Sequence, residues 1–261
     1  SKIKSVATLK LTSANTATLG TVANGTAGIA TVEIANGTTS LTFDDDVDNF
    51  TVNADALADD GALTIADDDT GSEGHKSNVA VTNLEGDLTA TNLAGTLTVT
   101  TKDVTGTGAL TITTGSGATT ANLAATTGDT VNIDAAALAD NTALILNGGG
   151  AGDIGTVSIT NLEGDLTLTN VTGAAAALKI STSDVSDDGM TIGANTVTTL
   201  NTTIGGGNSG DTITFAGVAG DVIAGTGSNG AALLASKLSV TGSSDAQTIT
   251  GGGAADTIIG G

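Results

Sequence analysis

The sequence predicts an all-β protein, a β-solenoid of the parallel β-helix or β-roll type. Three observations predict this fold class: aliphatic residues alternate with threonine, a unit of about 80 residues recurs, and aromatic side chains are nearly absent. Alternation with a period of two gives a strand one buried face and one exposed face. Recurrence favours stacked coils, because each unit then buries its apolar residues against its neighbours.

The alternation appears in segments such as Leu-Thr-Val-Thr, Leu-Thr-Ile-Thr and Val-Ala-Val-Thr, which Gly, Asn and Asp interrupt at short intervals. Threonine is β-branched and suits the outer face of a strand, while Gly, Asn and Asp favour turns. No apolar stripe of helical period persists along the chain, so helix is disfavoured. Only the Ala-Leu segments at 54–60 and 134–141 are compatible with a single helical turn.

The repeat is visible in matching segments. "VTNLEGDLTATN" (81–92) returns as "ITNLEGDLTLTN" (159–170) at a shift of 78, and "TVN" at residue 51 returns at residue 130, a shift of 79. These matches predict one unit of about 80 residues that is present two and a half times. The domain organisation that follows is a cap or degenerate repeat at 1–40, solenoid repeats at about 41–118 and 119–204, and a partial repeat at 205–261.

The core is expected to be narrow. The chain has no Trp or Tyr and only three Phe, and stacked ladders of Leu, Val, Ile and Ala fill a thin core that large rings would not fit. At about 20 residues per coil the chain makes roughly a dozen coils, a rod about 60 Å long. Tandem β-sandwich repeats are the alternative fold, although such domains usually keep a core aromatic residue and some Pro, which this chain lacks.

The net charge of −21 excludes a nucleic-acid binder, because no basic surface exists to neutralise phosphates. No apolar run approaches the roughly 18 residues of a membrane helix, so membrane insertion is not expected. The absence of Cys leaves oxygen ligands as the means of holding a stabilising metal ion. Acidic, cysteine-free composition therefore favours a soluble protein that binds divalent cations.

An enzymatic function is not expected. His75 is the one histidine, so catalytic triads and histidine-rich metal sites lack their components. Paired carboxylates are plentiful, but the aromatic platforms and cationic partners of sugar-cleaving clefts are missing, because the chain has no Trp, Tyr or Arg.

Two nonapeptides near the C-terminus predict a calcium site. "GGGAADTII" (251–259) and "GGNSGDTIT" (206–214) match the pattern G-G-x-G-x-D-x-U-x except at the fourth position. In a calcium β-roll the glycines let carbonyl groups point inward, and aspartates of neighbouring turns complete an oxygen cage. The alternative is a metal-free turn of the same geometry. The candidate Ca²⁺ ligands are Asp211, Asp221 and Asp256, with Gly206 and Gly251 in the turns.

A second acidic segment is a further calcium candidate. "FDDDVDNF" places Asp44, Asp46 and Asp48 at alternate positions, as in D-x-D-x-D calcium loops, but Asn49 stands where such a loop has Gly. A solvated acidic loop is the alternative reading of this segment.

The nonapeptides and the composition resemble the calcium-binding nonapeptide-repeat (RTX-type) proteins of bacteria. More narrowly, the chain resembles Thr-, Ala-, Gly- and Asp-rich surface-layer proteins and adhesins that type I secretion exports. The resemblance implies a secreted structural protein of the cell surface that folds with calcium and forms a lattice with copies of itself, with cell-surface polysaccharide as a further partner. The alternative is the stalk or binding segment of a secreted adhesin that recognises a glycan or a cell surface.

The repeated Glu-Gly-Asp triplet raises a separate question, because Glu85, Asp87, Glu163 and Asp165 are either a duplicated site or part of a duplicated turn. The segment that follows the first triplet, "NLAGTL" (92–97), keeps Asn, Leu and Gly but replaces both acidic residues. We therefore expect the flanking leucines to point into the core, the central glycine to turn the chain, and the carboxylates to point outward.

Overall fold

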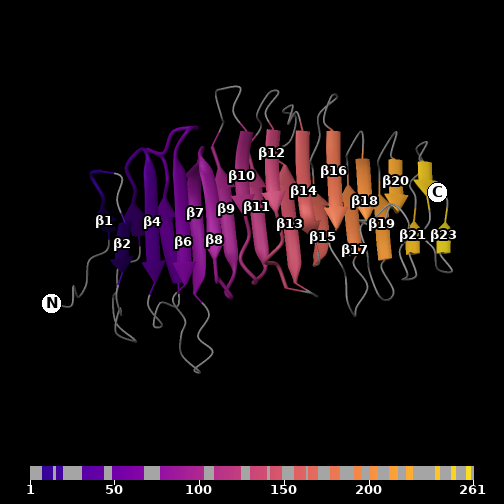
Figure 1. Ribbon diagram of the computed structural model, residues 1–261, viewed down its shortest axis with the longest axis horizontal. Coiled ribbons are helices and arrows are strands. Elements are labelled where there is room, and N and C mark those ends of the chain that lie inside the picture. Colours follow the sequence, from indigo (N-terminus) through magenta and orange to yellow (C-terminus); the bar gives the residue numbers. More distant parts are fainter. Residues whose placement is uncertain are drawn as a thin grey trace.

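The computed structural model confirms an all-β solenoid. The described residues form a 12-stranded and an 11-stranded sheet between which the chain alternates. Each strand pairs in parallel with the strand two positions away in the sequence. The strands follow one another from β1 at one end to β23 at the other (Figure 1). Tandem β-sandwiches are excluded as the fold, because sandwich sheets are antiparallel. The number of strands per sheet agrees with the dozen coils expected from the sequence.

The structure describes residues 8–13, 16–19, 31–43, 49–67, 77–102, 109–124, 130–139, 142–148, 156–162, 164–169, 177–182, 191–195, 200–204, 212–216, 222–225, 239–241, 248–250 and 257–259. The 12-stranded sheet contains β1 (Thr8–Lys10), β3 (Thr31–Glu33), β5 (Asn49–Asn53), β7 (Asn78–Leu84), β9 (Leu97–Thr101), β11 (Thr119–Leu123), β13 (Ala143–Gly148), β15 (Asp165–Thr169), β17 (Thr191–Asn195), β19 (Thr212–Ala216), β21 (Ser239–Thr241) and β23 (Thr257–Ile259). The 11-stranded sheet contains β2 (Thr16–Leu19), β4 (Thr38–Phe43), β6 (Ala62–Asp67), β8 (Asp87–Thr91), β10 (Ala109–Thr113), β12 (Thr130–Asp134), β14 (Thr156–Leu162), β16 (Ala177–Thr182), β18 (Leu200–Ile204), β20 (Val222–Gly225) and β22 (Thr248–Thr250).

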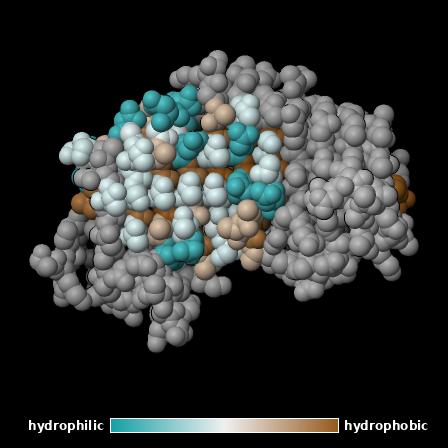
Figure 2. Space-filling view, viewed as in Figure 1, coloured by the Kyte–Doolittle hydropathy of each residue, from teal (hydrophilic) through white to brown (hydrophobic). Residues whose placement is uncertain are grey.

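The core lies between the two sheets, where the alternating aliphatic residues meet. In β6 every second residue is buried, and in β12 the same alternation buries Val131 and Ile133. The parallel register stacks these residues in rows, so that Val131 lies beside Val157 and Ile133 beside Ile159. The outer face shows pale rows of near-neutral residues with narrow apolar stripes between them (Figure 2). The sequence pattern thus fills a thin core and leaves hydroxyl and amide groups outside.

Asparagine of the Thr-Asn-Leu motif has a conformational role. Asn83, Asn92 and Asn161 have φ values of 58°, 55° and 56°, the left-handed region that Asn enters more readily than most residues. At Asn83 the β7–β9 register shifts between Val81 and Leu84, and the same shift follows Ile159 in β14. The bulge places two residues outside in succession and returns the leucine to the core. This local geometry explains why every copy of the motif keeps its asparagine.

The glycine of each Glu-Gly-Asp triplet is required by the coil beneath it. A Cβ atom on Gly86 would lie 2.3 Å from the carbonyl oxygen of Gly61, and one on Gly164 would lie 2.0 Å from that of Thr142. The turn expected at these glycines is present, but its cause is close backbone approach between coils. The Asp87 amide donates to the same Gly61 oxygen at 2.9 Å, which locks the two corners together.

The Ala-Leu segments form successive turns and no helix. The amide of Leu57 donates to the oxygen of Ala54 at 2.8 Å, and the amide of Gly61 donates to that of Ala58 at 2.8 Å. In the second copy, Leu138 and Thr142 make the corresponding bonds. Leu57 and Leu138 are fully buried, so each segment carries a leucine across the corner of the coil. Neither segment forms the single helical turn with which its sequence is compatible. Two tight turns in succession bury one leucine at each corner instead.

The repeated hydrogen bonds also define how the two copies align. Asn83 donates to Asn53 Oδ1 at 3.0 Å, and Asn161 donates to Asp134 Oδ1 at 3.0 Å. Asn53 thus corresponds to Asp134, a shift of 81, so the alignment of the two "TVN" triplets at 79 is wrong by two residues. The identical triplets give the wrong alignment, whereas the hydrogen bonds of Asn83 and Asn161 identify the equivalent residues.

One repeat spans seven strands, which is three and a half coils. β5 corresponds to β12 and β7 to β14, and each of these pairs joins a strand of the 12-stranded sheet to one of the 11-stranded sheet. The second copy is therefore turned by half a revolution about the long axis relative to the first. Equivalent corners lie on opposite edges of the solenoid. The predicted boundaries at about 40, 118 and 204 stay predictions. Parallel strand pairing continues across the first of them through β2–β4 and across the second through β9–β11.

Thr39 offers a test of the core. It is fully buried on β4 beside Leu63, and its Oγ1 has no hydrogen-bond partner among the described residues. Thr39→Val is expected to raise the free energy of unfolding by about 1 kcal/mol, because an unpaired buried hydroxyl is replaced by a methyl group. Urea unfolding measures the change. Thr42→Val, on the outer face of the same strand, is the control and should change little; a loss of stability in Thr39→Val would contradict the assignment.

Candidate functional site

The calcium residues predicted from the sequence lie outside the described residues. These are Asp211, Asp221, Asp256, Gly206, Gly251, Asp44, Asp46 and Asp48. The strands beside them are described. In the sequence Asp211 and Asp256 directly precede β19 and β23 of the 12-stranded sheet, and Asp221 directly precedes β20 of the other sheet. The strands that follow these aspartates in the sequence thus belong to different sheets.

The last three strands recur at a spacing of nine residues, the length of the predicted calcium nonapeptide. β21, β22 and β23 begin at Ser239, Thr248 and Thr257, and they alternate between the two sheets. Ser239 pairs directly with Thr257 and Val240 with Ile258, so one full coil contains 18 residues. Two nine-residue segments per coil therefore give parallel strands in register, which is the backbone arrangement that stacks successive turns.

The first Glu-Gly-Asp triplet engages its carboxylates within the protein. Lys102 Nζ lies 2.9 Å from Glu85 Oε2 and 3.6 Å from Asp55 Oδ1, and it donates to the Asp55 carbonyl oxygen at 2.9 Å. Asp87 Oδ1 accepts the Thr111 amide proton at 2.8 Å. Three successive coils are joined at this corner, since Asp55, Glu85 and Lys102 follow β5, β7 and β9. The triplet is a structural element in this copy.

The leucines around both triplets behave as the sequence predicts. Leu84, Leu88, Leu162 and Leu166 are all fully buried. The side chains of Glu163 and Asp165 lie outside the described part. Ser183 stands where the aligned first copy has Lys102, so the second copy lacks this lysine. The lysine cluster was missed in the sequence because Lys102 is 47 residues from Asp55, and only the coil stack brings them together.

The Lys102 cluster gives a pH-dependent prediction. The hydrogen bond to Glu85, opposed by partial burial and aided by both carboxylates, raises the pKa of Lys102 above its ordinary value of 10.5. A raised folded-state pKa stabilises the fold fully below pH 10.5, and this contribution is lost as the pH rises through the folded value. Lys102→Met should therefore lower the free energy of unfolding by about 1 kcal/mol at pH 7, with the difference shrinking in strong alkali.

Denaturant unfolding of Lys102→Met at pH 7 and above pH 10.5 measures this effect. Lys10→Met is the matched control, because Lys10 pairs with Glu33 at 3.3 Å but is largely exposed. The control should change little at either pH. Equal losses in the two variants would contradict a special role for the Lys102 cluster.

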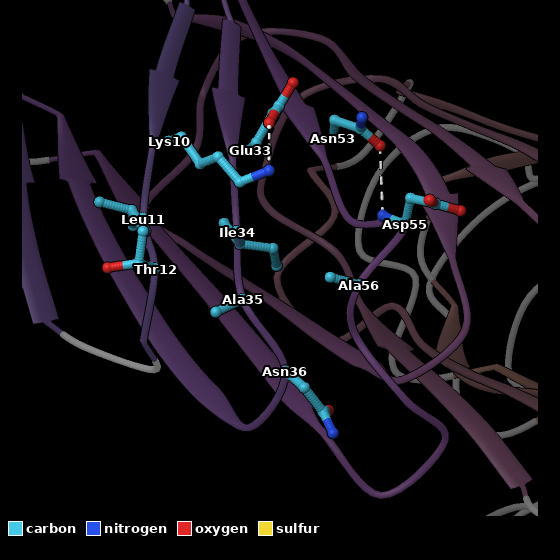
Figure 3. Close-up of a pocket in the computed structure, with 10 residues that line it drawn as sticks. All are labelled: Lys10, Leu11, Thr12, Glu33, Ile34, Ala35, Asn36, Asn53, Asp55 and Ala56. Carbon is cyan, nitrogen blue, oxygen red and sulfur yellow. Dashed lines mark hydrogen bonds and ion pairs between the residues drawn. The ribbon is translucent and has the colours of Figure 1, made fainter.

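A cavity of about 480 Å³ lies at the corner that follows β1, β3 and β5. Figure 3 shows Lys10 and Glu33 pointing toward each other on one wall, with Asn53 and Asp55 on the other. The Asn53 side chain accepts the Asp55 amide proton at 3.2 Å, which shapes the turn. Lys10, Glu33 and Asn53, which line the cavity, thus make contacts within the protein. Within the described ranges, no group of three or more His, Cys, Asp or Glu residues is arranged to hold a metal ion.

No protein-family model, curated protein or solved structure matches the chain. Among the described residues, no helix has the length and apolarity to cross a membrane.

Proposed function

We propose that the chain is a structural protein of a bacterial surface layer, a calcium-stabilised β-solenoid that forms a lattice with copies of itself outside the cell. The observation that carries the proposal is the 18-residue coil of β21 to β23, in which parallel strands recur every nine residues, the length of the predicted nonapeptide. Nonapeptide turns that repeat at this spacing suit Ca²⁺ through aspartate and carbonyl oxygens. Asp256 and Asp211 are the ligands to test first, because each lies in a nonapeptide that begins with Gly-Gly.

The charge and the surface support the same function. A chain of net charge −21 repels its own copies, and bound Ca²⁺ reduces that repulsion where two copies meet. The long, regular stack of strands supplies a unit whose outer face carries pale rows of near-neutral residues (Figure 2). Type I secretion and contact with cell-surface polysaccharide belong to the same proposal, on the basis of the nonapeptide resemblance.

Calcium removal is the direct test. Chelation with EDTA should lower the melting temperature, because an ion bound only to the folded chain stabilises it by about 2.7 kcal/mol at a concentration 100-fold above its Kd. Circular dichroism measures the melting curve, and light scattering with electron microscopy follows assembly as Ca²⁺ is restored. Asp256→Asn should weaken both responses. Asp60→Asn should not, because Asp60 is an exposed turn residue far from the nonapeptides in the sequence.

Each outcome has a distinct meaning. A melting curve that neither EDTA nor millimolar Ca²⁺ changes would contradict the calcium proposal. Calcium-dependent stability in a protein that stays monomeric would contradict the lattice, and it would favour the adhesin stalk instead.

A further inference from the structure

The turn between β3 and β4 holds an Asn-Gly pair in an unusual arrangement. Asn36 is exposed, and Gly37 has a φ of 102°, a left-handed conformation that glycine adopts without strain. Asn36 Oδ1 accepts the amide proton of Gly37 at 2.8 Å and that of Ala58 at 3.0 Å. Ala58 belongs to the corner of the next coil, 22 residues further on. Asn36 lies at the far end of the residues that line the cavity (Figure 3).

We propose that Asn36 is a site of spontaneous deamidation that the stacked coils promote. The Gly37 nitrogen attacks Cγ of Asn36, a Gly37 N–Asn36 Cγ bond forms, and the Cγ–Nδ2 bond breaks. The leaving group departs as ammonia with the proton that the Gly37 nitrogen gives up. Water then opens the cyclic imide at either carbonyl, giving aspartate or isoaspartate. Nothing is oxidised or reduced, and solvent water is the only co-reactant.

The geometry brings the reacting groups together before the reaction starts. The hydrogen bond from Ala58 fixes the Asn36 side chain over its own backbone, so Cγ stays next to the Gly37 nitrogen. Ala58 also keeps donating to Oδ1 while negative charge develops on that oxygen during the attack. Gly37 has no Cβ to hinder the approach. The promoting group thus comes from a neighbouring coil.

The sequence repeats the Asn-Gly dipeptide at 24–25, 147–148 and 229–230, and the copy at 147–148, which the structure describes, provides an internal comparison. Asn147 and Gly148 lie inside β13, where they pair with Asn122 and Leu123 of β11. Asn147 Nδ2 donates to Asn122 Oδ1 at 2.9 Å, so its amide is held along the stack of coils. Attack by the Gly148 nitrogen would require the strand to leave its extended conformation. Deamidation at Asn147 is therefore expected to be slow in the folded protein.

Deamidation at Asn36 has a structural consequence. Aspartate adds one negative charge beside an ordered corner. Isoaspartate adds a methylene group to the main chain between β3 and β4, which lengthens a turn whose side chain is bonded to the Ala58 amide. The first coils of the described stack then lose register with the coil above them, so this site limits how long the N-terminal part stays intact.

The test compares the two asparagines in one sample. The folded protein is incubated in heavy-oxygen water at mildly alkaline pH, and peptide mass spectrometry follows conversion at each asparagine; a parallel sample is kept in urea. Isoaspartate is confirmed by labelling with an isoaspartyl methyltransferase. In the folded protein Asn36 should convert at least about tenfold faster than Asn147, whereas the unfolded chain should convert both at similar rates.

Two variants complete the test. Asn36→Ser should remove the conversion that peptide mapping assigns to position 36, as distinct from any at Asn24, and leave the rate at Asn147 unchanged. Asn147→Ser should leave the rate at Asn36 unchanged. The proposal is overturned if folding protects Asn36 as strongly as Asn147, or if Asn36 reacts more slowly in the folded protein than in urea.

Discussion

Gly86→Ala is expected to destabilise the protein by about 3 kcal/mol, the upper part of the usual range for overpacking. Its new methyl group would lie 2.3 Å from the Gly61 oxygen and 2.6 Å from the Ala58 oxygen. Both neighbours are backbone atoms of the coil beneath, so relief requires that coil to move. Movement would also strain the bond from the Asp87 amide to Gly61. Urea unfolding followed by circular dichroism measures the loss.

Gly61→Ala is the matched control. Its nearest contact, at 2.5 Å, is a side-chain atom, Leu57 Cδ1, and its nearest backbone contact is the Ala58 oxygen at 3.0 Å, so the loss should be smaller. Gly117→Ala should repeat the large effect, because its Cβ would lie 1.9 Å from the Gly95 oxygen. Equal losses in Gly86→Ala and Gly61→Ala would show that backbone contact between coils is not what requires glycine.

Leu88→Ala is expected to cost 2–5 kcal/mol, the usual range for truncating a fully buried leucine. Leu88 is 0% exposed and lies in the row between Leu63 of β6 and Ile112 of β10. A solenoid core is only two side chains thick, so few neighbours exist to refill the space. Thr89→Ala, on the outer face of the same strand, should stay within about 0.5 kcal/mol. Comparable losses in the two variants would contradict the inward orientation of Leu88.

The fold could be predicted from the sequence because its signals are local. Alternation identifies the strands, and the repeated motif identifies equivalent positions along the stack. The asparagine of the Thr-Asn-Leu motif was recognised as part of the scaffold, and its left-handed φ supplies the reason. At Ala54–Gly61 alanine and leucine are compatible with a helical turn, but burial of Leu57 at a corner overrides that preference.

The candidate sites depend on contacts that no local pattern shows. Lys102 reaches Asp55 across 47 residues, and Ala58 reaches Asn36 across 22. Both contacts arise from the stacking of coils, and the coil length varies along the chain, so fixed spacing in the sequence does not reveal them. At the end of the chain the spacing is regular, since β21, β22 and β23 begin nine residues apart.

The odd number of strands in each repeat has an evolutionary consequence. Because one unit contains seven strands, inserting or deleting a single unit moves every later strand from one sheet to the other. A surface that faced one partner would then face the opposite way. Inserting or deleting two units restores the original facing and changes only the length. Selection on any contact made downstream should therefore favour variants whose unit number changes in pairs.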